Sequence, residues 1–426
     1  MPPIAARQSR EEESASGILK TRALHLLGMA LLALTFATPY LVGALGAYLQ
    51  ILCAALGTGV LLLEGRGRGL ALERDPGFKF LLLALGILVV AFACTAKQPG
   101  DAAYALNFVM LLGFGPISRF MARFGKPANA HLVAGFALIG SITALLFAVY
   151  LTAIAHYDRA PGWETDPIWS AEAAVILGFL AALGFVVPGR WRLLYLLGPL
   201  LGVIICILSG SRGPLLAVPV LALVLAASSR KWWLLVLVIA VGAVLSLALK
   251  CFWSGSLDRL MSIFSIAGNV ASGREAGEVS AATRLAFYQA SYAAFLHSPW
   301  IGFGWGAKMQ AIVPYLPGDG AALVAPHLHL HSDILDFGVA GGIAGLFAYF
   351  LIIAGPIVAA VRSPRDSQYR VRLTGVLIVA SGYFVCGLTY LMFGYEFHTE
   401  LYVCLVAVII GYCRDEPVRP PVPAAR

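Results

Sequence analysis

The chain has 426 residues, of which 60% are hydrophobic and 12% are charged, and its formal net charge is +8. Soluble globular domains carry about 45–50% apolar and about 25% charged residues, so this composition excludes a soluble globular protein. A helix that crosses a membrane needs about 20 apolar residues. The composition therefore predicts an all-α, polytopic membrane protein.

Long apolar runs without charged side chains predict about twelve transmembrane helices. Nine of them fall within residues 22–249 and three within residues 337–413, and the intervening segment 250–336 is more polar. The polar residues 1–21 and the proline-rich residues 414–426 are expected to be tails. The twelve runs are approximately residues 23–43, 44–63, 80–96, 102–118, 132–155, 173–188, 193–209, 213–228, 232–249, 337–361, 373–393 and 401–413.

The distribution of basic residues predicts the orientation of these helices, because cytoplasmic loops carry an excess of Lys and Arg. With a cytoplasmic N-terminus, 22 of the 30 basic residues fall inside, and the inner face carries +13 against −5 for the outer face. The positive net charge is therefore a signal of topology and does not indicate a nucleic-acid partner. Both tails are expected in the cytoplasm, and residues 250–336 are expected to form a large outer loop that contains helices.

The positions of the acidic residues disfavour a transporter. Glu172, Asp336 and Glu400 lie at the outer ends of predicted spans, and no charged residue falls near the middle of one. An ion-coupled transporter would be expected to carry some there. A division into nine and three helices also does not suggest two similar halves.

The first outer-face motif is the run SGSRGP at residues 209–214, in a turn between two predicted spans. Arg212 is one of three basic residues in the short outer loops, on a face that is otherwise negative. A planar guanidinium beside the start of a helix suits a phosphate group. A snorkelling arginine beside helix-breaking residues is the structural alternative, and the spacing alone favours neither interpretation.

The second motif spans residues 280–306 and begins with an apolar periodicity typical of an amphipathic helix that ends at Pro299. Thr283 is the expected N-cap, which would place Arg284 in the first turn. A cation there is unfavourable for the helix dipole, and an anionic ligand would reverse this effect. The Gly-x-Gly-x-Gly run at 302–306 is expected either to give the backbone freedom around a lipid or sugar or to be an ordinary loop.

The third motif, PHLHLHSD at residues 326–333, contains three alternating histidines. In an extended segment, His327, His329 and His331 would lie on one face, where they could bind zinc. Alternatively, one imidazole held before the next helix by a Ser332 cap could act as a base. A hydrogen-bonded structural histidine is the third alternative.

Taken in this order on this topology, the three motifs resemble the O-antigen ligase and polymerase superfamily, and most closely the O-antigen ligases of Gram-negative bacteria. The resemblance covers roughly residues 204–344. It rests on the turn at 211–213, on the helix that runs from Arg284 to the segment 297–306, and on His331 before an apolar helix with Gly338.

This resemblance implies a membrane glycosyltransferase of the GT-C type in the bacterial inner membrane, with its active site and the loop 250–336 facing the periplasm. It would transfer O-antigen polysaccharide from undecaprenyl diphosphate to the lipid A core oligosaccharide, with inversion and without a metal or another cofactor. By position, His331 would accept the proton of the acceptor hydroxyl, and Arg212 and Arg284 would bind the diphosphate. Membrane lipids would be the remaining partners.

One position departs from the family pattern, because His331 is followed by Ser332 where the family usually has Asn. The zinc alternative and the choice of the base among His327, His329 and His331 therefore stay open at this point. Four outer-face residues are candidates for binding substrate: His329, Lys308, Glu396 and His398. The rival functions are an O-antigen polymerase, then a protein oligosaccharyltransferase and, from another class, a transporter.

Overall fold

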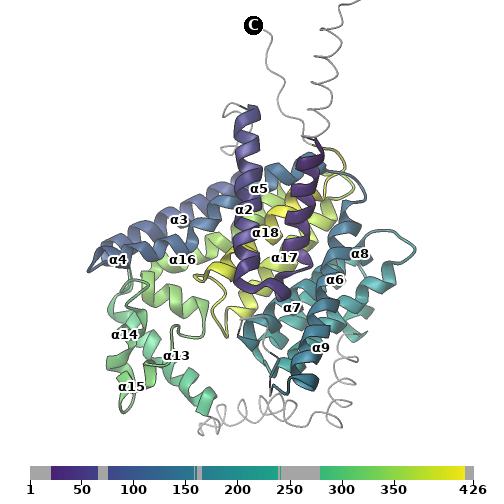
Figure 1. The fold of residues 1–426 in the computed structure, drawn as a ribbon. Coiled ribbons are helices and arrows are strands. Elements are labelled where there is room, and N and C mark those ends of the chain that lie inside the picture. The colour runs from purple at the N-terminus through teal and green to yellow at the C-terminus, as the bar shows by residue number, and fades with distance from the viewer. Residues whose placement is uncertain are drawn as a thin grey trace, which may run out of the picture.

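The computed structural model describes residues 21–65, 75–157, 159–160, 166–237, 240 and 279–417. In this part of the chain the regular structure is helical, and no strand is present (Figure 1). The predicted all-α class of a polytopic membrane protein is therefore confirmed. Residues 1–20, 250–278 and 418–426, which belong to the predicted tails and to the predicted outer loop, lie outside the described residues.

Within the described ranges, eight helical runs are long and apolar enough to cross a membrane. Several of them join an α-helix to a short 3-10 or π-helical stretch. They are α2 (Pro39–Gly65); α3 (Pro76–Thr95); α4 (Pro99–Ala102) with η2 (Ala103–Gly113), α5 (Phe114–Met121) and η3 (Ala122–Phe124); α6 (Asn129–Val149) with η4 (Tyr150–Ile154); α7 (Pro167–Ala181) with α8 (Leu183–Val186); η5 (Arg192–Leu196) with α9 (Leu197–Ser209); α16 (Asp333–Val361); and α17 (Tyr369–Cys386).

Three shorter apolar helices complete this set among the described residues: Thr21–Phe36, η6 (Gly213–Leu216) with α10 (Ala217–Ser229), and α18 (Glu396–Tyr412). Eleven of the predicted spans therefore coincide with helices. The ninth, residues 232–249, lies mostly outside the described part of the chain. The count of twelve consequently stays a prediction.

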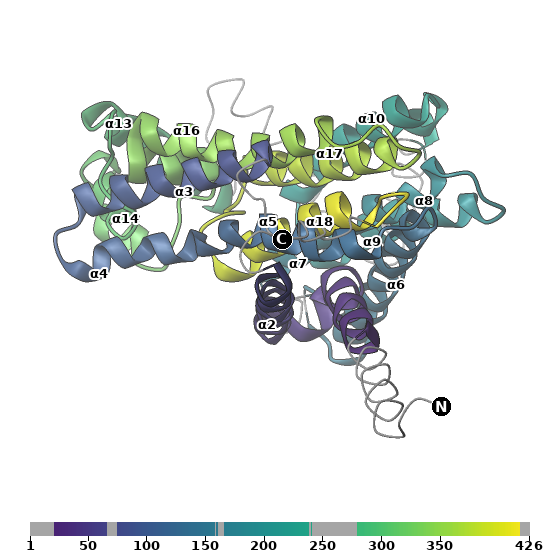
Figure 2. The ribbon, with the colours of Figure 1, turned by 90° about the horizontal axis from the view of Figure 1, so that it is seen from above.

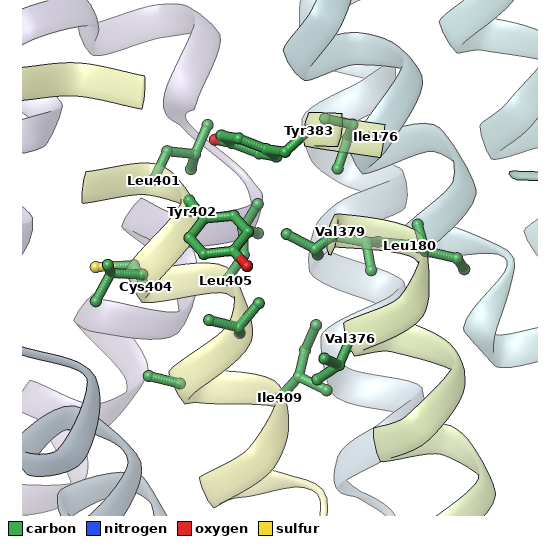
Figure 3. Packing of buried hydrophobic residues seen from close by; sticks show 14 of the residues in the cluster. Ile176, Leu180, Val376, Val379, Tyr383, Leu401, Tyr402, Cys404, Leu405 and Ile409 are labelled. Carbon is green, nitrogen blue, oxygen red and sulfur yellow. The ribbon is translucent and has the colours of Figure 1, made fainter. Parts of the chain in front are cut away.

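The centre of the bundle is α7, whose sequence is apolar on nearly all sides, as expected for a helix that others surround. Within the membrane-length run that it begins, 89% of the residues in the apolar window are buried. Ile176 and Leu180 of α7 lie beside Val379 of α17, and α18 packs on the other side of α17 (Figure 3). Gly178 allows α9 to approach closely, because a Cβ atom there would clash with the backbone of Gly198.

α16 lies alongside α3 and is broken at Gly342, which has a positive φ of 60° (Figure 2). The loop 299–304 packs its backbone against this break, and the amide of Ile343 donates to the carbonyl of Pro299 at 2.7 Å. A side chain at Gly342 or at Gly302 would clash with the backbone that faces it. The first glycine of the Gly-x-Gly-x-Gly run therefore serves close packing against α16, which supports the structural interpretation of this run.

Four short elements gather at one end of α16 and form the described part of the predicted outer loop (Figures 1 and 2). They are α13 (Val279–His297), α14 (Lys308–Ile312), η7 (Val313–Tyr315) and α15 (Gly320–Val324). α13 ends two residues before Pro299, close to the predicted end of the amphipathic helix. These elements share a small core with α16 and the segment before it, made of Phe287, Ala290, Ala294, Met309, Ile312, Leu316, Val324, Leu330 and Val339.

The start of α17 and the end of α18 are held together by a fully buried arginine, Arg372. Its guanidinium donates to Ser363 Oγ at 3.0 Å and to the carbonyl of Cys413 at 2.6 Å, and it forms an ion pair with Asp366 at 2.8 Å. These contacts tie the loop between α16 and α17 to the end of α18. This end of the bundle is therefore fixed independently of the end where the three motifs lie.

Candidate functional site

The three sequence motifs meet on residues 387–395, here called the connecting segment because it joins α17 to α18. The amide of Asp333, at the start of α16, donates to the carbonyl of Gly387 at 2.7 Å. The hydroxyl of Tyr288, on α13, lies 3.2 Å from the carbonyl oxygen of Leu388. Gly213, in the first motif, packs closely on Thr389 of the connecting segment. A Cβ atom at Gly213 would clash with the hydroxyl of Thr389.

Asp333 fixes the start of α16 against the connecting segment. Its buried Oδ1 accepts hydrogen bonds from the amides of Met392 at 2.8 Å and Phe393 at 3.2 Å. The preceding residue, Ser332, occupies the N-cap position, but its side chain makes no capping hydrogen bond. The expectation that the side chain of Ser332 caps this helix is therefore wrong. The carboxylate of Asp333 instead anchors the start of the helix that follows His331.

The three histidine rings gather, although the segment that carries them is not extended. The ring centroid of His331 lies 4.4 Å from that of His329 and 5.3 Å from that of His327. The tyrosine ring of Tyr390, on the connecting segment, lies 4.5 Å from His329 and 5.6 Å from His331. His331 has a left-handed backbone with a φ of 58°, so a turn rather than the predicted alternation brings the rings together.

Both backbone polar groups of His331 are held by side chains. Its amide donates to Nδ1 of His329 at 3.1 Å, and its carbonyl oxygen lies 3.0 Å from the hydroxyl of Tyr288. The left-handed region is unfavourable for a residue with a Cβ atom, and such strain persists only where surrounding contacts hold it. The site therefore maintains His331 in a conformation that its own backbone disfavours.

The two ring nitrogens of His331 have different surroundings. Nε2 lies 3.4 Å from Nδ1 of His327, whereas Nδ1 is buried and has no hydrogen-bond partner among the residues that the structure describes. If Nε2 carries the ring proton and donates it to His327, the lone pair of Nδ1 is available. A buried acceptor without a partner is costly in a folded protein and is typical of a functional group.

The pKa of His331 is lowered to about 3, mainly by burial and then by the positive charge of Arg284 and by His327. The pKa of His329 falls to about 2, because the ring is buried and lies near His331 and Lys308. The cluster is therefore uncharged at neutral pH. Among the charged groups, Arg284 has the largest effect on the pKa of His331.

Arg284 lies on α13, which begins at Val279 in the described chain. Thr283 is consequently inside the helix, and the expectation that it is the N-cap is wrong. Arg284 lies beyond the first turn, so the dipole argument for an anion at this position is weaker than the sequence implied. On the same helix, the ring of Phe287 lies 5.1 Å from His327 and 6.3 Å from His331, and it packs α13 against the histidine cluster.

Arg212 follows α9, which ends at Ser209 and has Gly210, with a φ of 64°, as its C-cap. A second arginine that the sequence did not single out, Arg159, holds this turn. Its Nε donates to the carbonyl of Ser209 at 2.8 Å, and its guanidinium donates to Ser211 Oγ at 3.3 Å. Two cationic side chains therefore belong to the turn. The only signal in the sequence was that Arg159 is another basic residue in a short outer loop.

Lys308, a candidate for binding substrate, is buried and forms an ion pair with Asp336 at 2.7 Å. Burial lowers the pKa of the ammonium group, and the negative charge of Asp336 opposes this shift. Asp336 also accepts from the amide of Leu330 at 3.2 Å. This geometry favours a role for Lys308 in holding the histidine segment.

The remaining candidates are His398 and Glu396 on α18. His398 is 1% exposed, and neither ring nitrogen has a hydrogen-bond partner in the described ranges. Its ring lies 5.0 Å from that of Trp169 on α7, and Trp169 in turn lies 6.3 Å from Tyr390. His398 is therefore joined to the histidine cluster through two aromatic rings. Glu396 is the first residue of α18, and its side chain lies outside the described residues.

The described residues contain no group of three or more His, Cys, Asp or Glu side chains arranged to hold a metal ion. This finding includes the cluster of His327, His329 and His331, in which Nδ1 of His329 already accepts the amide of His331. The geometry therefore does not support the zinc alternative.

Residues 197–350 match the family model described as O-antigen ligase, and no curated protein matches the chain. The matched region runs from the first turn of α9 into the middle of α16 and contains all three motifs. It also contains Arg212, Arg284 and His331. The chain is therefore a polytopic membrane protein whose residues 197–350 are similar to the O-antigen ligase family.

Proposed function

We propose that the protein is an O-antigen ligase of the bacterial inner membrane whose active site faces the periplasm. It transfers O-antigen polysaccharide from undecaprenyl diphosphate to a hydroxyl of the lipid A core oligosaccharide. The family match supports an enzyme of O-antigen processing and covers both ligases and polymerases. The choice of the lipid A core as acceptor is part of the proposal.

The observation that carries this proposal is the setting of His331. The amide and the carbonyl group of its backbone are both held by hydrogen bonds, and Nδ1 of its ring has no partner in the described part of the chain. The charge of Arg284 also acts on this ring. A general base needs an unprotonated nitrogen in a fixed position. An adjacent guanidinium provides a binding group for the leaving diphosphate.

Two arginines on separate segments form the proposed diphosphate site. Arg284 comes from α13 and Arg212 from the turn after α9, and both segments contact the connecting segment. A guanidinium offers five donors in a planar fork that matches phosphate oxygens. Fixed donors of this kind stabilise the charge that develops on the diphosphate as the glycosidic bond breaks.

In the proposed step, the oxygen of the acceptor hydroxyl attacks the anomeric carbon and forms the new glycosidic bond. The bond from this carbon to the diphosphate oxygen breaks, and undecaprenyl diphosphate leaves with both electrons. Nδ1 of His331 takes the proton of the hydroxyl. The diphosphate offsets the charge of Arg284, which lowers the pKa of His331 in the free protein. Donor binding therefore raises the basicity of His331 before the attack.

The proposal is tested by transfer with purified components. The protein is incubated with glycan linked to undecaprenyl diphosphate, with and without purified lipid A core. A ligase gives a glycan-bearing lipid A core and no elongation of the donor when the core is absent. A polymerase gives longer lipid-linked glycan in both reactions and no product on the core, and this result would replace the ligase by the polymerase.

A further inference from the structure

Tyr288 connects three parts of the site through one hydroxyl group. This hydroxyl lies 3.0 Å from the carbonyl oxygen of His331 and 3.2 Å from that of Leu388 on the connecting segment. The side chain is partly buried, and burial raises the pKa of the phenol, so the hydroxyl keeps its proton at neutral pH. Its single proton can be donated to either carbonyl oxygen or shared between the two.

The backbone of His331 needs such a contact. With a φ of 58°, it occupies a region that is unfavourable for a residue with a Cβ atom. His329 fixes the amide of His331, and Tyr288 fixes its carbonyl group. Removal of either contact would let the backbone relax toward ordinary conformations, and the direction of the imidazole would change with it.

Tyr288 also follows Arg284 by four residues on α13, so the two side chains lie on the same face of the helix. Phe287 lies between them in sequence, and the centroid of its ring is 6.3 Å from that of His331. One helix thus carries the proposed diphosphate ligand, an aromatic contact to the base and a hydrogen bond to the backbone of the base.

We propose that Tyr288 is a positioning residue whose hydroxyl holds His331 in its left-handed conformation and fixes the connecting segment against α13. This inference rests on the proposed function, in which His331 is the base. Tyr288 itself does not touch the reacting atoms, and it acts through the direction in which it holds the imidazole.

The test replaces one hydroxyl at a time on the same helix. Tyr288→Phe removes the hydroxyl that holds His331. Tyr292→Phe, one turn further along, is the matched control, because Tyr292 is 63% exposed and has no place in the site. Tyr288→Phe is expected to lower kcat about 10- to 100-fold, as for other residues that orient a functional histidine. The KM for the undecaprenyl-linked donor is expected to stay within about twofold, because the phosphate ligands remain.

The pH profile gives a readout that a loss of stability alone would not move. A ring that is held less firmly becomes better hydrated, and its pKa rises toward about 6.5. The acid limb of kcat/KM for the donor is therefore expected at higher pH in Tyr288→Phe than in the wild type. The titratable and charged groups that face His331 are Arg284, His327, His329 and Tyr390. All four stay in place in Tyr288→Phe, which removes only the hydroxyl.

A third variant protects the test against a failure to fold. Tyr288→4-aminophenylalanine keeps a donor at the same place and is expected to recover most of kcat. If Tyr288→Phe behaves like Tyr292→Phe, or if the donor KM rises while kcat is unchanged, the inference is overturned.

His331→Ala in the same assay separates the two claims. If this variant stays active, the assignment of the base and this inference fail together. If His331→Ala is inactive while Tyr288→Phe matches Tyr292→Phe, the inference alone fails.

Discussion

Lys308 and Asp336 form an ion pair with Nζ 2.7 Å from Oδ1, and their side chains are only 4% and 0% exposed. The ammonium group also lies 3.7 Å from the ring centroid of Trp305. The pair joins α14 to the first turns of α16. Because Asp336 accepts from the amide of Leu330, it also holds the turn between His329 and His331.

Lys308→Met is expected to destabilise the protein by about 3–5 kcal/mol, because the change leaves the carboxylate of Asp336 buried without its cation. The double variant Lys308→Met/Asp336→Asn should recover part of this loss. Thermal unfolding in detergent measures both effects. A Lys308→Met protein with wild-type stability and a raised KM for donor or acceptor would instead establish Lys308 as a substrate ligand.

Arg159→Ala is expected to raise the donor KM about tenfold, because the turn that presents Arg212 loses two hydrogen bonds. Arg159→Lys should be intermediate, since an ammonium keeps the charge but not the fork geometry. Lys97→Ala is the matched control, as it removes an exposed positive charge from another short loop of the same predicted face. Equal donor KM values for Arg159→Ala and Lys97→Ala would reject this role.

His327→Ala is expected to lower kcat about tenfold without abolishing transfer, because Nδ1 of His327 lies 3.4 Å from Nε2 of His331 and orients the ring. Leu328→Ala serves as the control, since Leu328 is 74% exposed beside it. Initial rates at saturating donor and acceptor measure the effect. Complete loss of transfer in His327→Ala with full activity in His331→Ala would move the base to His327.

The pH dependence follows from the lowered pKa of His331. In the free protein this pKa is about 3, so the base stays unprotonated and kcat/KM for the donor should not fall between about pH 7.5 and pH 5. In the proposed donor complex the diphosphate would offset the charge of Arg284 and raise the pKa of His331, so the acid limb of kcat should lie at higher pH than that of kcat/KM. Coincident acid limbs near about pH 6.5 would show a solvent-exposed base.

The lowered pKa values of the buried histidines should also make the free energy of unfolding decrease as the pH falls. The folded-state pKa values of His329 and His331 are about 2 and about 3, below the unfolded value of about 6.5. As the pH falls below about 6.5, the unfolded chain takes up protons that the folded cluster does not, and stability decreases. His329→Leu should weaken this dependence between about pH 6 and pH 4. An unchanged slope of the melting temperature against pH would contradict the buried, neutral state of His329.

The elements that the sequence predicted well depend on strong, local signals. The predicted apolar runs coincide with eleven helices in the described ranges, eight of them of membrane length, and the periodicity after residue 280 predicted α13. The helix start was placed too late, because Thr283 has the chemistry of an N-cap but the helix already exists before it. Composition around a single residue does not decide which of several helical turns is the first.

The parts that the sequence could not predict depend on contacts between distant residues. Arg159 holds a turn that follows it by 50 residues, and Tyr288 bonds to a carbonyl group 100 residues away. The connecting segment has no motif of its own, since its main role is to offer backbone groups to the other segments. The alternating histidines did predict a cluster, but they did not reveal the left-handed turn at His331 that forms it.

The central claim is that His331 is the base for attack on a donor whose diphosphate is bound by Arg212 and Arg284. It is tested most directly by single-turnover transfer from undecaprenyl-diphosphate-linked glycan to lipid A core with His331→Ala, alongside binding of undecaprenyl diphosphate. The predicted result is a rate loss of about 10²- to 10⁴-fold with unchanged binding, whereas Arg212→Ala and Arg284→Ala weaken binding. Transfer by folded His331→Ala at the wild-type rate would contradict the claim.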